Sequence, residues 1–509
     1  MNIESVRRYF DLNKKERYQK IEDNTASDLN IDEVFERIDF TKTPIGQQFL
    51  YNTLRSIPTG ESVVAQNEKW IDHYSGKIEL QKKLDNLFLK LDDYDSFSIY
   101  PLIIEDHKPF SKLQAFIFHC LQFIPTALLL VFLVTKSWFF VIALTLFFSI
   151  NLYVHYYSKA KLFYYKGSIP MLRQLIYICR KLNRDKELGG ELLNNSEITE
   201  AIYKTKKTYR QLSNYRFGVK LESDIAMIAW LISELVSIFF LSEVVNLNNI
   251  FKRIRTNRKE LICIFEYVGL IDTLSSVSRM REDVDYYSLP CFSGDSYRLD
   301  FKDIYHPLIE NCVPNSLSLN KKSYLVLGAN MSGKTSFIRT VGINLIIAQT
   351  LNTSFSKQMI LSKQKIYSVI AVSDNLVQGH SYYLSEVLRM KRLIDNTQDG
   401  SNLILLDELF KGTNTKERIA SAKAVLNFLF SNKYNRILAA THDLELTTLL
   451  ADTFEQIFFE EKIDENNLSF DYKIAFKHSG RMNAIRILEL YQFPQEIIEE
   501  ALITVKTKG

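Results

Sequence analysis

The chain has 509 residues, which is enough for two or three domains with full-sized cores, and 46% of its residues are hydrophobic. Its formal net charge of +4 is small for this length, so the total neither requires nor excludes a nucleic-acid partner. Its five cysteines are scattered and form no C-x-x-C pair, which favours reduced thiols in a cytosolic compartment and argues against a zinc site or a disulfide framework. The first twenty residues lack the apolar core of a signal peptide, so we expect no secretion.

Residues 1 to about 110 are polar and charged with helical spacing, and they predict an N-terminal helical region. Within it, Ile31 to Asp39 predicts a helix, a capped turn follows around Thr43-Pro44, and a second amphipathic helix ends before Pro58. We interpret the charged residues of this segment as a solvated helix face; they are Arg37, Asp39 and Arg55.

The composition changes abruptly at Leu113. Residues 115–134 are almost wholly apolar, and after Thr135-Lys136-Ser137 a second apolar run extends from Trp138 to about Tyr157. Each run is close to the ~20 residues that a helix needs to cross a bilayer, and the short connection forces an antiparallel hairpin. The sequence therefore predicts a transmembrane helical hairpin over residues 113–157, with the lipid bilayer as its partner.

The charges around this hairpin predict its orientation. Basic residues flank it on both sides, whereas Lys136 alone lies in its loop; the flanking residues are Lys108, Lys112, Lys159, Lys161, Lys166 and Arg173. The positive-inside rule then predicts a multi-pass protein of the cytoplasmic (inner) membrane, with both termini and the C-terminal domain in the cytoplasm. Two alternatives stay open: a hairpin buried in a large soluble core, and a hairpin that dips into one leaflet around Pro125.

Residues 158–285 predict a second helical region. Its apolar stretch Ile225 to Val245 contains Glu234 and Glu243, which are costly inside a bilayer, so we interpret it as a helix buried against the C-terminal domain or lying near the membrane. The stretches 159–222 and 246–282 are rich in basic residues. Such a cluster can bind phosphates of nucleic acid or of anionic lipid head groups, but it is more often a solvated helix face. Residues 286–300 contain Pro290 and Gly294 and predict a linker.

A phosphate-binding loop follows the apolar run Tyr324 to Leu327, which predicts a buried strand. The loop reads Gly328-Ala329-Asn330-Met331-Ser332-Gly333-Lys334-Thr335 and leads into a helix through Ser336, so it matches the pattern G-x-x-x-x-G-K-[ST] in its required context. In this pattern the glycines let backbone N–H groups face an anion. The lysine reaches phosphate oxygens, and the threonine hydroxyl completes the shell of a Mg²⁺ ion. The segment predicts a nucleotide site.

Two further strands carry polar groups at their ends. Asn402 to Leu406 predicts a buried strand that ends in Asp407 and Glu408, and Arg436 to Ala440 predicts another that leads to Thr441-His442. Beside a phosphate loop, an aspartate at a strand end can hold Mg²⁺ and a glutamate can polarise the attacking water. His442 is then placed to sense or orient the γ-phosphate.

These motifs together resemble the ATPase domain of the MutS family of DNA mismatch-repair and recombination proteins, an ATPase of the ABC class. The matching segments are the Asn330-Met331 core of the loop, the signature-like segment Asp374 to Glu386, the carboxylate strand with its following loop Asp407 to Thr415, the switch-histidine segment Ala440 to His442, the base-side segments His306-Pro307 and Val313 to Asn315, and Val34 to Gly46 at the start of the helical core.

The resemblance implies a fold: an α/β P-loop ATPase domain over residues 301–509, with an all-α core and lever region before it. It implies ATP and Mg²⁺ as cofactors, with Thr335 and Asp407 as metal ligands. Lys334, Glu408 and His442 would be catalytic, residues 328–336 and His306 would bind the nucleotide, and Ser381 would complete the site of the opposing subunit in a homodimer. DNA is the macromolecular partner that it implies.

The sequence also departs from the family pattern. The chain starts at the helical core without a mismatch-reading domain, Tyr382-Tyr383 replaces the usual Thr-Phe, and an apolar hairpin lies where the lever helices would lead towards DNA. Two functions therefore stay open. One is a membrane-anchored ATPase that couples ATP-driven dimer closure to DNA binding; the other is a membrane-tethered mechanochemical or scaffold ATPase with no DNA role. A transporter is a third, weaker alternative, because two spans make a poor pathway.

Overall fold

The computed structural model describes residues 2–106, 110–162, 165, 167–190, 196–213, 224–295, 298–320, 322–329, 331–370, 382–464, 467–477 and 493–508. The chain forms two compact units, which we call the helical unit (residues 1–14, 39–52 and 70–279) and the sheet unit (residues 15–38, 53–69 and 280–509). Because the chain passes between the units several times, these units differ from the continuous ranges predicted from the sequence, and the predicted domain boundaries stay a prediction.

The helical unit contains the helices that the N-terminal pattern predicts. They are α1 (Ile3–Leu12), α4 (Pro44–Leu54), α6 (Ile78–Phe88), η1 (Tyr94–Ser98), α7 (Ile99–Ile104), α8 (Lys112–Thr135), α9 (Trp138–Leu162), α10 (Ser168–Arg184), η3 (Lys186–Gly190), α11 (Ser196–Lys204), α12 (Lys206–Ser213), α13 (Asp224–Phe239) and α14 (Ser242–Thr256). Two more helices, α5 (Glu61–Tyr74) and α15 (Arg258–Asp283), contribute to both units. The N-terminal region is thus mostly helical, as expected, although it also contains the short strands Gln19–Lys20 and Ser56–Ile57.

The capped turn before α4 is present. The Thr43 hydroxyl accepts a hydrogen bond from the Gly46 amide at 2.9 Å and donates one to Asp272 of α15 at 2.7 Å. Gly46 is required here, since a Cβ at this position would lie 2.1 Å from the Asp272 carboxylate. The cap therefore fixes α4 to α15 inside the helical unit.

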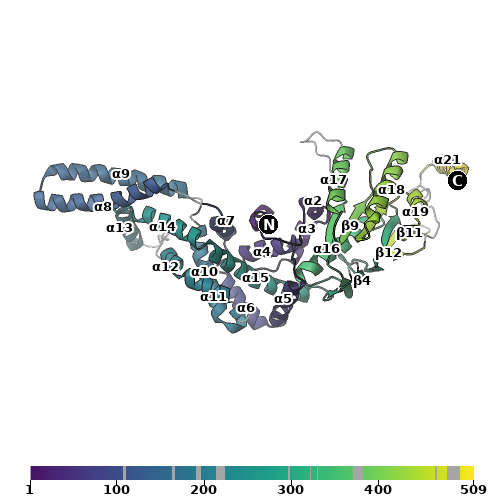
Figure 1. The fold of residues 1–509 in the computed structure, drawn as a ribbon, viewed down its shortest axis with the longest axis horizontal. Helices are drawn as coiled ribbons and strands as arrows, with labels where there is room; N and C mark the ends of the chain where they lie inside the picture. The colour runs from purple at the N-terminus through teal and green to yellow at the C-terminus, as the bar shows by residue number, and fades with distance from the viewer. Residues whose placement is uncertain are drawn as a thin grey trace. The chain divides into compact units, whose positions relative to one another are not determined.

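The predicted hairpin forms two long helices, α8 and α9, drawn at the left of Figure 1. A capping box of Ser111 and Gln114 starts α8, the helix continues through Pro125, and Lys136 ends it in a left-handed conformation. Only 17% and 11% of the most apolar windows of the two helices are buried. The described chain thus does not enclose the hairpin in a soluble core.

By length and composition, three described helices could cross a membrane: Leu113–Thr135, Trp138–Ala160 and Arg258–Asp283. The last is 78% buried within the protein, which suits a core helix. A bent pair, Leu231–Phe239 with Ser242–Thr256, passes the same test together with a bend of 74°. This pair contains most of the apolar stretch Ile225 to Val245, which is therefore broken at the end of α13 rather than one helix. It is also not simply buried, because α13 leaves much of its apolar surface exposed.

The sheet unit is built on a six-stranded sheet in the order β12-β11-β6-β10-β9-β8. Its strands are β6 (Ser323–Gly328), β8 (Lys365–Val369), β9 (Asn402–Asp407), β10 (Asn435–Thr441), β11 (Phe454–Asp464) and β12 (Asn467–Ala475). All neighbouring pairs are parallel except β11 with β12. The mixed α/β character predicted for the C-terminal half is confirmed.

Helices cover both faces of this sheet (Figure 1). Ile404 and Leu406 of β9 face a core formed with α17 (Tyr382–Asn396) and α18 (Thr415–Ser431). The intervening Leu405 faces α16 (Lys334–Leu351), where a Cβ on Gly342 would lie 2.6 Å from it. Burial on both faces explains why the central strands read as continuous apolar runs. The short helices α19 (Glu445–Leu449) and α21 (Gln495–Lys508) complete the C-terminal part.

A smaller sheet, in the order β3-β7-β4-β5, lies in the same unit. It consists of β3 (Cys291–Phe292), β4 (Leu299–Ile304), β5 (Asn315–Ser318) and β7 (Gln358–Leu361). Residues 286–300, predicted as a linker, thus supply β3 and the start of β4. The N-terminal segments of this unit form α2 (Asp23–Asp28), α3 (Ile31–Ile38) and the short pair β1 (Gln19–Lys20) and β2 (Ser56–Ile57).

One expectation for these N-terminal segments is wrong. Arg55, interpreted as part of a solvated face, has a side chain that is only 1% exposed. Its guanidinium donates to the carbonyl oxygen of Ile21 at 2.9 Å and to Asp23 at 2.7 Å. Both acceptors of these hydrogen bonds lie in a segment about thirty residues earlier in the chain. Helical spacing alone therefore could not reveal that Arg55 is buried. Arg37, by contrast, is 42% exposed and pairs with Asp283.

Candidate nucleotide-binding site

The phosphate-binding loop joins β6 to α16 at the carboxyl edge of the large sheet. Gly328 and Gly333 have φ angles of 150° and 103°, a region that favours glycine. At Gly328 a Cβ would also lie 2.5 Å from the carbonyl oxygen of Phe459 on the adjacent strand β11. The sequence pattern and the backbone geometry therefore agree on why glycine stands at both positions.

Lys334 is the first residue of α16 and is only 4% exposed. Its ammonium group curls back over the loop and donates to the carbonyl oxygens of Gly328 and Ala329, both at 2.7 Å. Burial lowers the pKa of Lys334, while the charges of Glu408 and Asp407 act in the opposite direction. A buried cation held over an amide-lined loop is an arrangement that suits phosphate oxygens.

Thr335 and Asp407 meet beside the loop. The threonine hydroxyl donates to Asp407 Oδ2 at 2.7 Å, and Asp407 Oδ1 is buried with no hydrogen-bond partner in the described part of the chain. Burial also raises the pKa of Asp407. A buried carboxylate oxygen beside a hydroxyl oxygen is a donor set that fits Mg²⁺, which prefers oxygen ligands.

Glu408, the residue after Asp407, is held between two basic side chains. Its Oε2 lies 2.5 Å from Lys411 Nζ, and its Oε1 lies 3.4 Å from His442 Nδ1. Burial alone would raise the pKa of Glu408, but the hydrogen bonds and charges of Lys411 and His442 outweigh it and lower the pKa below its usual value. Glu408 is thus a fixed, ionised carboxylate at the strand end.

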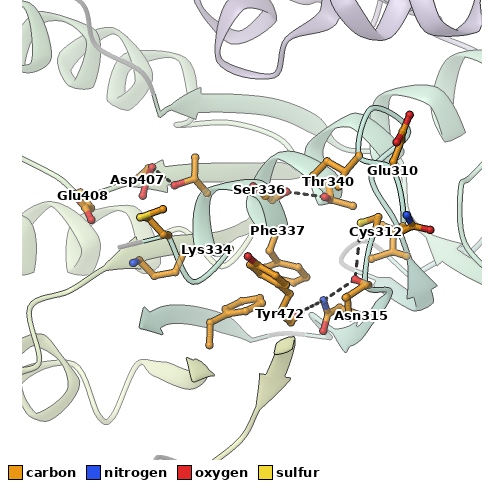
Figure 2. A pocket seen from close by; sticks show the side chains of 18 of the residues that line it. Glu310, Cys312, Asn315, Lys334, Ser336, Phe337, Thr340, Asp407, Glu408 and Tyr472 are labelled. Carbon is orange, nitrogen blue, oxygen red and sulfur yellow. Dashed lines mark hydrogen bonds between the residues drawn. The ribbon is translucent and has the colours of Figure 1, made fainter. Parts of the chain in front are cut away.

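These groups border one cavity of about 640 Å³ (Figure 2). Lys334, Thr335, Asp407, Glu408 and Lys411 line one part of it. The rest is lined by aromatic and apolar side chains together with polar ones; the former include Phe337, Phe459, Tyr472, Ile309, Cys312 and Val313, and the latter Glu310, Asn311, Asn315, Ser336 and Thr340. This volume lies within the range of small-molecule sites, and a charged part joined to a mixed aromatic and polar part suits a nucleotide.

Lys411 and Tyr472 are among the side chains of this cavity that were not predicted from the sequence. Lys411 lies three residues after Glu408, a spacing at which side chains meet within one turn, so a signal was present. Tyr472 comes from β12 and is held by Asn315 of β5, whose side chain donates to the Tyr472 carbonyl oxygen at 2.9 Å. No spacing in the sequence brings residues 315 and 472 together.

His306 lies apart from this cavity. It is 5% exposed and lines a neighbouring cavity of about 620 Å³, together with Tyr286, Tyr305 and Phe355. Its Nδ1 accepts a hydrogen bond from the Leu308 amide, and burial, with a smaller effect of Arg339, lowers its pKa to about 4. The loop that follows, Ile309 to Val313, is the part of this segment that reaches the first cavity.

The other predicted site residues are distributed as follows. Ser332 is buried, Met331 is 85% exposed, and the Ser336 carbonyl accepts from Thr340. His442 contacts Glu408 from the end of β10, beside the cavity. Asn330 and Ser381, with most of the signature-like segment, lie outside the described residues. Nucleotide and Mg²⁺ binding by this set stays a prediction.

Comparison with known proteins gives a consistent result. Residues 324–507 match the family model MutS domain V. The DNA mismatch repair protein MutS of Persephonella marina is 29% identical over 248 residues, which cover 46% of this chain and 28% of that protein. Endonuclease MutS2 of Carboxydothermus hydrogenoformans is 31% identical over 256 residues, 49% of this chain and 32% of that protein. The DNA mismatch repair protein MutS of Petrotoga mobilis is 33% identical over 262 residues, with shares of 48% and 32%. The chain thus matches about a third of the length of these relatives.

Proposed function

Since the chain is a member of the MutS family through its domain V region, we propose that it is a Mg²⁺-dependent ATPase. One observation carries this proposal most directly. The buried Lys334, the Thr335–Asp407 pair and the ionised Glu408 converge on a single cavity at the carboxyl edge of a parallel sheet. The relatives that match this region are DNA mismatch repair proteins and an endonuclease by name, which supports an ATPase that acts in DNA transactions.

In this proposal Lys334 and the loop amides bind the β- and γ-phosphates of ATP, and Thr335 and Asp407 hold Mg²⁺. The metal, when bound, neutralises charge on the phosphate oxygens. Glu408 accepts a proton from the attacking water as the bond from water oxygen to the γ-phosphorus forms and the bond to the ADP oxygen breaks. Lys411 and His442 fix the Glu408 carboxylate and keep it ionised, and His442 orients the water.

We also infer that two copies act together. Ser381 would reach the γ-phosphate of the opposing subunit, so that ATP closes a homodimer and hydrolysis reopens it. This inference rests on the family resemblance of the signature-like segment, because Ser381 lies outside the residues that the structure describes. A dependence of the hydrolysis rate on protein concentration, lost in Ser381→Ala, would support it.

The α8–α9 hairpin supports a membrane anchor. Its exposed apolar surface, two helices of 24 and 25 residues and basic flanks suit an antiparallel pair that crosses the bilayer. In this arrangement both ends of the chain and the ATPase lie in the cytoplasm, at the cytoplasmic (inner) membrane. Movements of the dimer would then be transmitted to helices fixed in the membrane.

DNA binding is favoured by one observation in the helical unit. A cavity of about 620 Å³ is bordered by five basic side chains and one acidic side chain; these are Lys83, Lys90, Lys181, Arg184, Lys186 and Asp185. Lys90 and Lys181 both lie over the ring of Tyr177, at 4.6 and 5.9 Å. Such a concentration of positive charge suits a phosphate backbone. The alternative is a membrane-tethered mechanochemical or scaffold ATPase with no DNA role.

One experiment tests these proposals together. ATP hydrolysis by detergent-purified protein is measured with and without duplex, mismatched and branched DNA, across a salt series. Lys334→Ala is expected to abolish hydrolysis, whereas Lys322→Ala, which changes an exposed lysine just before β6, leaves it unchanged. Stimulation by DNA or binding that weakens steeply with salt supports the DNA role. Hydrolysis indifferent to every DNA supports the scaffold alternative, and no hydrolysis in any condition would contradict the ATPase.

A further inference from the structure

The helix α13 exposes a continuous apolar face. Six large side chains of this helix are between 46% and 58% exposed: Met227, Ile228, Leu231, Ile232, Leu235 and Val236. They recur at positions i, i+1, i+4, i+5, i+8 and i+9, so they lie along one side of the helix. A stripe of large apolar side chains on this scale usually marks an interaction surface.

Helix α13 packs against α9 of the hairpin. Asn151 of α9 is fully buried and donates to the carbonyl oxygen of Phe239 at 3.0 Å. One turn further along α9, the buried His155 ring places Nε2 3.0 Å from Glu234. These contacts set the rotation of α13, so that its apolar stripe faces away from the polar side of the hairpin helix.

The charges at this contact are paired. Lys159 Nζ lies 2.6 Å from Glu234 of α13 and 3.2 Å from Glu243 of α14. An unpaired carboxylate near a bilayer is costly, and the ammonium group between these two carboxylates compensates one of their two charges. The acidic residues of this segment argued from the sequence against a position near lipid. Their ion pairing with Lys159 lowers the cost of that position.

The same cluster has the residue types and spacing of a metal site, but a lysine lies among its carboxylates. One ligand atom each from His155, Glu234 and Glu243 lies within 4.8 Å of the others. Lys159, however, already lies between the carboxylates, and His155 Nδ1 is buried without a hydrogen-bond partner in the described ranges. A metal-bound imidazole normally donates its other N–H to an acceptor. We therefore interpret the cluster as an ion-pair network that joins three helices.

The length of α13 limits how it can meet a membrane. Its 16 residues correspond to about 24 Å of helix, which is less than the ~30 Å thickness of a hydrocarbon core. At Leu241 the backbone becomes left-handed and the chain bends by 74° into α14. The apolar side chains of α14, including Leu247 and Ile250, are buried in the protein. The chain thus returns to the helical unit without crossing.

We propose that α13 is a third membrane-embedded segment, which enters one leaflet beside the hairpin and places its apolar stripe against lipid acyl chains. The proposal rests on the proposed membrane anchoring of α8 and α9. Lipid is favoured over a second copy of this chain because α13 contacts α9 directly, and α9 and α8, the proposed anchor, also expose large apolar side chains.

Site-specific photocrosslinking tests this proposal. Benzoylphenylalanine is introduced singly at Ile232 and Val236 on α13, at Leu133 on the hairpin, and at Tyr203 on α11 as an exposed control outside both surfaces. The full-length protein is reconstituted in phosphatidylcholine vesicles, irradiated and analysed by intact mass. Each variant is accepted only if its thermal transition matches the wild type. We expect a phospholipid adduct at Ile232, Val236 and Leu133, and none at Tyr203.

The outcomes separate this inference from the membrane anchor. A lipid adduct at Leu133 with none at Ile232 and Val236 would overturn the embedded α13 and leave the anchor intact. A crosslink between two copies of the chain at Ile232 or Val236 would replace lipid by a second copy. Absence of lipid adducts at all three positions would overturn the membrane anchor itself.

Discussion

The strand β6 and the helix α8 both form from apolar runs in the sequence, but the side chains of the strand are buried and many of those of the helix are exposed. From Ser323 to Leu327 every side chain of β6 is buried, whereas Phe116, Phe123 and Leu133 of α8 are 66%, 67% and 61% exposed. The strand is short enough for β10 and β11 to pair with both of its edges and for helices to cover both of its faces. Among the described residues, the 24-residue α8 packs mainly against its hairpin partner α9 and against α14.

The polar groups of the two regions differ in the same way. In the sheet unit they gather where the buried strands end, and there they form a cavity. In the hairpin region they gather on the side of α9 that contacts α13 and α14, and there they hold helices together. We therefore propose that the sheet unit carries the chemistry and the hairpin the attachment, and each prediction below tests one side of that division.

The largest effect is expected from removing the exposed run. Replacing residues 113–157 by a short polar linker should move the protein from the membrane fraction to the soluble fraction, because the most extensive exposed apolar surface is gone. Fractionation of cells that express each form measures this, with ATP hydrolysis as a check that the sheet unit remains folded. If both forms fractionate with the soluble proteins, the hairpin is not a membrane anchor.

The second prediction concerns Glu408. Glu408→Gln should lower the rate of ATP hydrolysis by about 10²- to 10⁴-fold, the usual contribution of a general base, with little change in nucleotide affinity. Single-turnover hydrolysis and equilibrium binding of a fluorescent ATP analogue measure the two quantities separately. Glu417→Gln, on the exposed first turn of α18, is the matched control. Unaltered hydrolysis in Glu408→Gln would remove this carboxylate from the mechanism.

The third prediction concerns a buried ion pair of the sheet unit. Arg281 is 4% exposed and pairs with both carboxylate oxygens of Glu68, at 2.5 and 2.9 Å, while also donating to the carbonyl oxygen of Asn352 after α16. Arg281→Met should lower the free energy of unfolding by about 3 kcal/mol, the lower end of the range for a broken buried pair, because the partly buried Glu68 would lose its counter-charge and keep only the hydrogen bond from Asn352. The double variant Arg281→Met with Glu68→Leu should recover part of this loss, which chemical denaturation can measure.

The elements of the site were predictable from the sequence because they are local. The strand before the loop and the strands that end in Asp407 and before His442 have six or seven residues each, and each follows from a short apolar run, as the helix after the loop follows from the loop pattern. The hairpin helices follow from composition in the same way. The carboxyl ends of parallel strands meet at one edge, so the meeting of Thr335 with Asp407 also follows from the pattern.

What the sequence did not show depends on pairs of residues far apart in the chain. The burial of Arg55 depends on Ile21 and Asp23, and the position of Tyr472 depends on Asn315. The displacement of His306 from the nucleotide cavity depends on how the loop after it turns. The ion-pair network of α9 with α13 and α14 joins residues more than seventy positions apart. No periodicity encodes such contacts.

The smallest effect that we expect tests whether the sheet unit buries His306 as a neutral group. The folded-state pKa of about 4 lies below the ordinary value of 6.5. As the pH falls below 6.5, the unfolded chain therefore takes up a proton before the folded protein does, and stability is lost progressively down to pH 4. The difference corresponds to up to about 3 kcal/mol.

His306→Asn, whose side-chain oxygen can still accept from the Leu308 amide, should be less sensitive to pH in this window. His73→Asn, which changes a less buried histidine in the helical unit, should behave as the wild type. Urea denaturation at pH 4.5, 5.5 and 7 measures the three proteins, and identical pH dependence of wild type and His306→Asn would show that His306 is not buried as a neutral group.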